Sequence, residues 1–150
     1  MSGGMRVGIV EVLGAEEVND VLEKEFEKEV QGLEIKRKLV PTIDDASLGA
    51  KMLVEDMGCD AVVVGYALEE GEKLSQAFQI TILQAQYGLK AHIFRVIVPS
   101  DQDIEPYAQA AAKEIVRYFY KPTELQHERS VMKSEERKEE SSFNPFALFG

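Results

Sequence analysis

Between residue 6 and about residue 120, one pattern of apolar and polar positions occurs four times along the chain. A short apolar run is followed by a turn and then by a stretch in which apolar residues recur at helical spacing. The apolar runs cover residues 7–10, 33–40, 61–65 and 91–98. The helical stretches are expected near residues 15–30, from 44 or 45 to 58, 72–87 and 104–120. The pattern therefore predicts four strand–helix units in series.

The four strands differ in how much of their surface is expected to be covered. The runs 7–10 and 61–65 are apolar nearly throughout, which is typical of strands buried on both faces. In the run 33–40, apolar and charged residues alternate, as on the edge of a sheet. Successive strand–helix units favour parallel pairing with right-handed crossovers. We therefore expect an α/β protein, a three-layer α/β/α sandwich with a four-stranded parallel sheet in the order 2-1-3-4.

The helices are expected to pack in different ways. In the second helix, Asp44 or Asp45 is expected to accept hydrogen bonds from the free N–H groups of the first turn, with Leu48, Met52 and Leu53 facing inward. The third helix carries apolar residues around much of its circumference, and the fourth contains a run of small residues at 108–112. Subunit contacts and a core within a single chain both explain these two helices.

The composition limits the classes of partner. The chain has 150 residues, with 27 acidic against 17 basic side chains and a formal charge of −10. Such a field repels phosphates, so we expect no binding to nucleic acid or to an anionic membrane surface. The single Cys59 excludes an internal disulfide, and neither a long apolar run nor a signal-peptide pattern is present. A cytoplasmic location is therefore expected.

Several kinds of site have no matching motif in this sequence. No G-x-G-x-x-G follows the first strand and no Walker-type phosphate loop is found, so nucleotide cofactors are disfavoured. The two histidines, His92 and His127, are far apart and form no cluster with Cys59, so we expect no metal. His92 is interpreted as a structural histidine in its strand.

The remaining candidates lie in the loops that follow the strands. Ligands of open parallel sheets bind beyond the carboxyl ends of the strands. The segment 41–47 offers hydroxyl and carboxylate groups, of which we single out Asp45 and Ser47 as ligand-binding candidates. Tyr66 directly follows the most apolar strand. The possible proton-transfer groups in the same loop are Glu69, Glu70, Glu72 and Lys73. A helix cap and an ordinary solvated loop are the alternative interpretations of these two segments.

The composition changes after residue 122. Residues 123–140 are charged at short spacing, which indicates a linker or a solvated helix. Residues 141–150 form a Phe-rich tail. We predict that its large apolar side chains dock on a neighbouring subunit or a separate protein, a frayed terminus being the alternative. These candidate partner-binding residues are Phe143, Phe146, Leu148 and Phe149. The expected organisation is thus a domain at 1–122, a linker and a tail.

Several short segments, in matching order, resemble archaeal riboflavin synthase. They read V-G-I-V at 7–10, K-L-V-P-T-I-D-D at 38–45, G-C-D-A-V-V-V-G at 58–65, A-Q at 85–86, A-H-I at 91–93 and K-P at 121–122. The likeness spans residues 6 to about 126. That family is related to lumazine synthase, and the resemblance implies a flavodoxin-like sandwich that forms a homo-pentamer with active sites between subunits.

The resemblance also implies a reaction. One molecule of 6,7-dimethyl-8-ribityllumazine, a pteridine, would transfer a four-carbon unit to a second molecule, which gives riboflavin and a ribitylamino-pyrimidine without a cofactor. Asp45, Ser47 and Tyr66 would bind the ligand, and Glu69, Lys73 and Gln76 would be catalytic. Gln76 stands where the family has a His, and V-L-G-A-E at 12–16 replaces an aromatic and basic loop.

Two other functions stay open. One is a non-catalytic oligomeric relative that acts as a scaffold or ligand-binding module and docks a partner through its tail. The other is lumazine synthase itself, which would need a basic grip for a phosphate.

Overall fold

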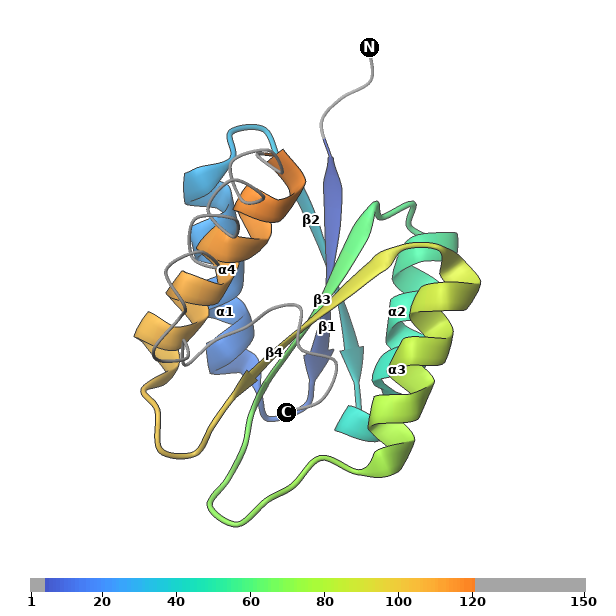
Figure 1. Cartoon of the computed structure of the whole chain (residues 1–150). Helices are drawn as coiled ribbons and strands as arrows, with labels where there is room; N and C mark the ends of the chain where they lie inside the picture. The colour runs from blue at the N-terminus through green and yellow to red at the C-terminus, as the bar shows by residue number, and fades with distance from the viewer. Residues whose placement is uncertain (1–4, 121–150) are drawn as a thin grey trace, which may run out of the picture.

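The computed structural model describes residues 5–120, which form a single four-stranded sheet with two helices on each face (Figure 1). Along the chain the elements are β1 (Arg6–Val12), α1 (Glu16–Glu29), β2 (Glu34–Val40), the 3₁₀ turn η1 (Ile43–Asp45), α2 (Ala46–Glu55), β3 (Ala61–Ala67), α3 (Gln76–Leu89), β4 (His92–Val98) and α4 (Ile104–Tyr120). All neighbouring strands pair in parallel, in the order β2-β1-β3-β4. The three-layer sandwich and the strand order expected from the sequence are both confirmed.

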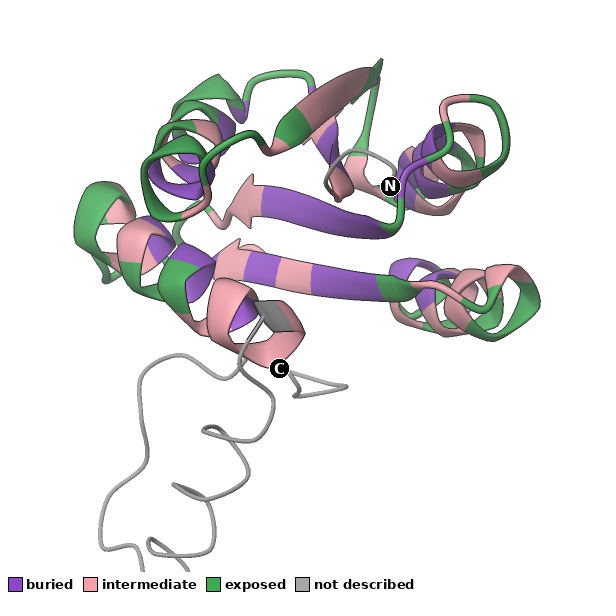
Figure 2. Ribbon diagram, turned by 90° about the horizontal axis from the view of Figure 1, so that it is seen from above, coloured by how far each residue is buried: buried purple, intermediate pink, exposed green. Residues whose placement is uncertain are grey.

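Two apolar cores lie on opposite faces of the sheet. Helices α1 and α4 cover one face, and α2 and α3 cover the other (Figure 1). The apolar side chains of β3 alternate between the cores, with Val63 in the first and Val62 and Val64 in the second. In Figure 2 the central strands are buried along most of their length, whereas each helix buries only its inward side. This arrangement is the period-two burial that a sheet covered on both faces requires.

Helix α2 packs on the sheet through small residues. Its buried positions are Ala46, Gly49, Ala50 and Leu53. A Cβ atom at Gly49 would lie 2.9 Å from Cγ1 of Val40, so only glycine allows the helix to approach β2 this closely. The prediction that Leu48 faces inward is wrong, since its side chain is 58% exposed. Because α2 lies so close to the sheet, the side of the helix that carries its small residues faces the sheet. Leu48 lies on another side of the helix and is exposed.

Helix α3 begins later than the sequence pattern indicated. It starts at Gln76 rather than near Glu72, because Ser75 is its N-cap and accepts a hydrogen bond from the N–H of Phe78 at 3.0 Å. Gly71, with a φ of +80°, turns the chain before the helix. Asp44 and Asp45 make no side-chain capping hydrogen bond to the turn or to α2, contrary to expectation, because their carboxylates accept from hydroxyl groups instead.

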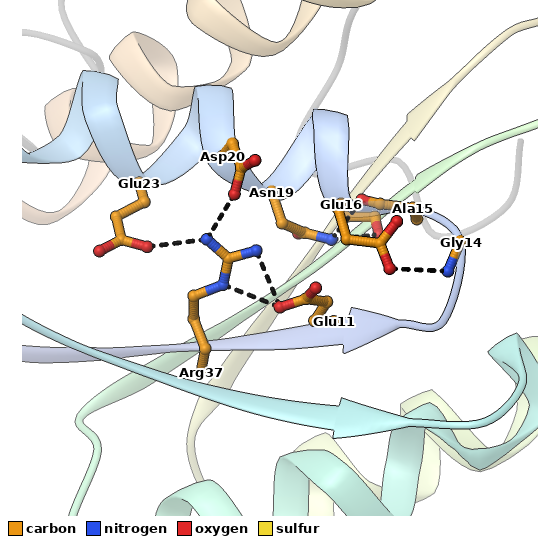
Figure 3. A network of polar contacts seen from close by, with 9 residues as sticks. Glu11, Gly14, Ala15, Glu16, Asn19, Asp20, Glu23 and Arg37 are labelled. Carbon is orange, nitrogen blue, oxygen red and sulfur yellow. Dashed lines mark hydrogen bonds and ion pairs between the residues drawn. The ribbon is translucent and has the colours of Figure 1, made fainter.

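A cluster of charged side chains connects the edge strand β2 to the first helix layer (Figure 3). Arg37 on β2 forms ion pairs with Glu11 of β1 at 2.8 Å and with Asp20 and Glu23 of α1 at 2.8 and 2.9 Å. Partial burial alone would lower the pKa of this guanidinium, but the three carboxylates raise it above its ordinary value. Arg37 therefore stays charged and joins three elements on one side of the sheet.

The predicted boundary at residue 122, the linker at 123–140 and the tail at 141–150 lie outside the residues that the structure describes. Within residues 5–120, no helix has both the length and the apolar character needed to cross a membrane.

Candidate functional site

The loops that follow the four strands lie at the same edge of the sheet, the lower edge in Figure 1. Backbone hydrogen bonds join them in pairs. The N–H of Leu13, after β1, donates to the carbonyl of Val40 at 2.9 Å, and the N–H of Leu68, after β3, donates to the carbonyl of Val98 at 2.9 Å. This edge is where open parallel sheets bind their ligands.

Tyr66 stands at the centre of this edge. It is the last residue but one of β3, and its half-buried ring packs with the core beneath α2 and α3. Its hydroxyl donates a hydrogen bond to Oε2 of Glu72. Burial raises the pKa of Tyr66 to about 12, helped by that hydrogen bond and by the negative charges of Glu72, Glu69 and Asp44. The phenol is therefore held in its neutral form.

The carboxylate of Glu72 accepts two hydrogen bonds. While Oε2 accepts from Tyr66, Oε1 accepts from the backbone N–H of Glu69 at 2.9 Å. The backbone N–H of Glu72 in turn donates to the carbonyl of Glu69 at 2.9 Å. The loop between β3 and α3 is thus closed on itself around one carboxylate, and the Tyr66 ring is tied to that loop.

A second set of hydrogen bonds connects the start of α3 with the 3₁₀ turn η1. The hydroxyl of Ser75 donates to Oδ1 of Asp44 at 2.7 Å, and the hydroxyl of Thr42 donates to Oδ2 of Asp45 at 2.9 Å. The turn after β2 and the first turn of α3 therefore lie next to each other. We call the four residues Asp44, Tyr66, Glu72 and Ser75 the rim cluster.

The structure places the residues singled out from the sequence as follows. Tyr66 lies in the rim cluster, and Asp45 directly follows Asp44 in η1. Glu69 contributes its backbone to the loop while its side chain is exposed, and the side chains of Lys73 and Gln76 are exposed at the start of α3. Ser47 lies in the first turn of α2 and lines a different surface.

That other surface is a shallow open groove between the outer sides of α2 and α3. Ser47, Leu48 and Lys51 line it from α2, and Thr81, Gln84 and Ala85 line it from α3. Ser47 thus lies where the groove begins, beside the edge that carries the rim cluster.

Of the rim cluster, sequence reasoning chose Tyr66, named Glu72 as a possible proton-transfer group and named Asp44 as a possible helix cap, but it did not name Ser75. It did not predict that Tyr66 pairs with Glu72 or that Ser75 pairs with Asp44. The pairing of Ser75 with Asp44 spans 31 residues and leaves no periodic signal. The one available signal was Ser75 itself, since a serine just before an apolar helical run is typical of an N-cap.

His92 lies at the opposite end of the sheet, at the start of β4. Its ring stacks on Phe94 and meets the edge of Tyr118, with ring centroids 5.7 and 5.0 Å apart. The Tyr118 hydroxyl is 3.2 Å from its Nε2 atom. Over the described part of the chain, no three His, Cys, Asp or Glu side chains are grouped so that they could hold a metal ion.

A parallel α/β sandwich with a polar site beyond the ends of its strands is the class that the fold and the site define. No family model matches the chain. The riboflavin synthase of Methanothermobacter thermautotrophicus is 29% identical to it over 119 residues, which is 71% of this chain and 78% of that protein. The riboflavin synthase of Methanothermobacter marburgensis is 29% identical over 113 residues, 67% of this chain and 74% of that protein. The chain is thus similar, at 29% identity, to two riboflavin synthases over about 70% of its length.

Proposed function

We propose that this protein acts in riboflavin biosynthesis as a riboflavin synthase. The observation that carries the proposal is the similarity to two riboflavin synthases over most of the chain, together with a polar cluster at the edge where this fold binds ligands. The reaction would be the dismutation of two 6,7-dimethyl-8-ribityllumazine molecules, in which one transfers a four-carbon unit to the other. The products are riboflavin and a ribitylamino-pyrimidine, and no cofactor takes part.

Each site residue has a role in this proposal. The half-buried ring of Tyr66 offers an apolar face to one heterocycle, while Asp45 and Ser47 supply polar contacts. Glu69 and Lys73, in the loop before α3, would exchange protons with the reacting rings, and Gln76, in the first turn of α3, would orient them through hydrogen bonds of its amide. Holding two heterocycles in register would supply much of the acceleration, because it replaces an encounter of two molecules by a preset geometry.

The proposal includes a homo-oligomer, a pentamer by resemblance, in a cytoplasmic location. The exposed side chains of Lys73 and Gln76 would then meet a ligand that a neighbouring subunit helps to enclose. Ile80 and Tyr87, seven residues apart on α3, are 51% and 73% exposed and lie on the same side of the helix. Large apolar side chains in this position support contact with a second copy of the chain.

The direct test is to incubate the purified protein with 6,7-dimethyl-8-ribityllumazine and to follow riboflavin by its fluorescence. We expect riboflavin to form, and the Lys73→Ala variant to form it at least about tenfold more slowly, because a proton-transfer group is lost. Lys24→Ala, an exposed lysine on α1, is the matched control and should keep the full rate. No riboflavin at high protein concentration would exclude this activity.

A non-catalytic relative is the second candidate function, and Gln76 favours it because an amide cannot exchange protons as an imidazole can. Such a protein would bind the lumazine without converting it. It could recruit a partner through Phe143, Phe146, Leu148 and Phe149. Deletion of residues 141–150 tests whether the tail recruits a partner, since it should alter the size of the assembly or the proteins that co-purify.

Lumazine synthase is a third candidate, and it would require binding of a phosphorylated substrate.

A further inference from the structure

Four aromatic rings lie together at the end of the sheet opposite to the rim cluster. They belong to His92 and Phe94 at the start of β4 and to Tyr118 and Phe119 in the last turn of α4. The His92 ring centroid is 5.0 Å from that of Tyr118 and 5.7 Å from that of Phe119, and the Phe94 centroid is 5.4 Å from that of Phe119. His92 is exposed and Phe119 is half-buried. We call these four residues the aromatic end cluster.

The aromatic end cluster adjoins an edge of the sheet that carries little charge. The two edge strands of the described sheet are β2 and β4. Strand β2 carries Lys36, Arg37 and Lys38 in succession, and charged side chains keep other segments from adding to an edge. Strand β4 reads H-I-F-R-V-I-V, so Arg95 is its one residue of fixed charge. The edge of β4 and the cluster beside it therefore form a surface suited to an apolar segment.

The described chain ends at this surface. Residue 120 is the last that the structure describes, and it directly follows Phe119 of the cluster. Of the residues that come after it, the tail at 141–150 contains three Phe, one Leu and no charged side chain. A random coil as long as residues 121–142 spans roughly 25 Å. The connection therefore lets the tail reach the cluster of its own chain, and it gives the tail an effective concentration of roughly millimolar order there.

Phe side chains gain most where other rings can meet them edge to face, because each ring also buries a large apolar area. The cluster already has this geometry, with angles of 76° between the rings of Phe94 and Phe119 and 84° between those of His92 and Phe119. We propose that the C-terminal tail docks on the aromatic end cluster of the same chain and covers the adjacent edge of β4. Phe146 and Phe149 supply the ring contacts.

Docking within one chain has two consequences. It withdraws the Phe side chains of the tail from a separate partner, and it protects the edge of β4 from the addition of another chain. The inference does not depend on the proposed function, because the aromatic end cluster and the rim cluster lie at opposite ends of the sheet.

Cross-linking of the full chain tests where the tail lies. The buried Cys59 is replaced in Cys59→Ala, so that only introduced cysteines react. His92→Cys then places a thiol on the cluster, and Ala147→Cys places one among the apolar side chains of the tail. We expect a short bismaleimide to link these two cysteines within one chain. The mass on a denaturing gel then stays that of a single chain, and peptide mass spectrometry identifies the link.

Two controls separate this result from the alternatives. Lys51→Cys places the thiol on an exposed position of α2, on the other face of the sheet, and should link to Ala147→Cys about fivefold less or lower still. Co-expression of a chain that carries only His92→Cys with a chain that carries only Ala147→Cys detects docking on a second copy, because a link between them doubles the mass.

Stability measures the same contact without a cross-linker. Deletion of residues 141–150 should lower the thermal unfolding midpoint by about 4 °C or more, because the docked rings return to water. In a Phe119→Ala background the deletion should lower the midpoint by about half as much or less, since a ring that the tail contacts is gone. Leu13→Ala, at a position 63% exposed in the loop after β1, is the matched background and should leave the effect of the deletion unchanged.

Equal linking of the tail to His92→Cys and to Lys51→Cys overturns the proposal, and so does a link that forms only between chains. A deletion that leaves the midpoint unchanged, or that has the same effect with and without Phe119, overturns it as well.

Discussion

Because Gly65 of β3 has no side chain, the side chain of Asn19 on α1 can lie directly against this strand. The buried Asn19 of α1 reaches across to the strand, where its Nδ2 donates to the carbonyl of Gly65 at 3.2 Å and to that of Ala15 at 2.9 Å. A Cβ atom at position 65 would lie 2.3 Å from Oδ1 of Asn19 and 2.9 Å from Cδ1 of Leu22. The helix can lie this close to β3 only because residue 65 has no side chain.

We therefore expect Gly65→Ala to lower the free energy of unfolding by about 1–3 kcal/mol, because the new methyl group overpacks the core. Urea denaturation measures the change. In an Asn19→Ala background the same substitution should cost less, since the nearest obstructing atom is gone. An equal cost in both backgrounds would mean that the contact between residues 19 and 65 is not the cause.

The raised pKa of Tyr66 predicts how stability changes at alkaline pH. A tyrosine in an unfolded chain has a pKa of about 10, whereas in the folded protein Tyr66 has a pKa of about 12. Between these values the unfolded chain loses the proton that the folded protein keeps, so stability falls as pH rises through this window. The free energy of unfolding should decrease more steeply there for the unaltered protein than for Tyr66→Phe.

Tyr87→Phe, which changes a largely exposed tyrosine, is the control and should follow the unaltered protein. Absorbance at alkaline pH reports phenol ionisation in the folded state. Glu72→Gln should move the Tyr66 ionisation to lower pH, since the neutral amide removes the nearby negative charge. Identical alkaline stability curves for the unaltered protein and Tyr66→Phe would contradict the prediction.

At the scale of elements, the sequence pattern located all four strands and four helices, while their ends and inner sides depended on neighbours. The helix 104–120 was predicted with its exact limits because its apolar stripe is long and regular. Helix α2 is short and rich in small residues, so its pattern pointed to Leu48 whereas close packing buried Ala46 and Ala50. The apolar Leu74 extended the helical pattern of α3 upstream of Ser75, although the chain there forms a loop.

Ser75 caps α3 and also holds η1 beside it, so its loss should affect both elements. We expect Ser75→Ala to lower the free energy of unfolding by about 1 kcal/mol, as for other N-cap serines. The exposed Ser100, in the loop after β4, provides the control, and Ser100→Ala should change stability by less than about 0.5 kcal/mol. Chemical denaturation compares the two. Equal effects of both variants would show that the cap contributes nothing measurable.

At the scale of the whole molecule, helix α3 leaves large apolar side chains exposed on its outer side. Helix α3 buries only Phe78 and Ile82, although most of its residues are apolar. The sequence alone left two interpretations of this helix, a core within one chain and a contact between subunits. The described structure leaves its outer side open, which favours the second.

We expect Ile80→Glu to reduce the size of the assembly, because a charge at a subunit contact would lose its water. Light scattering after size-exclusion chromatography measures the mass. Lys24→Glu introduces the same residue on an exposed position of α1 and should leave the mass unchanged. An unaltered mass for Ile80→Glu would show that this side of α3 is not the contact, and a monomeric unaltered protein would exclude the oligomer.

The sequence by itself determined the fold, because the alternation of apolar runs and helical stretches is a local property that each segment carries in its own residues. It also determined which edge of the sheet holds the polar loops, since parallel strands must all end there. Only the tertiary structure decided which side chains meet at that edge. Asp44 and Ser75 become partners because packing brings η1 beside α3, and Tyr66 is held by Glu72 because the intervening loop folds back on itself. Such contacts depend on distances between segments, which no periodicity along the chain records.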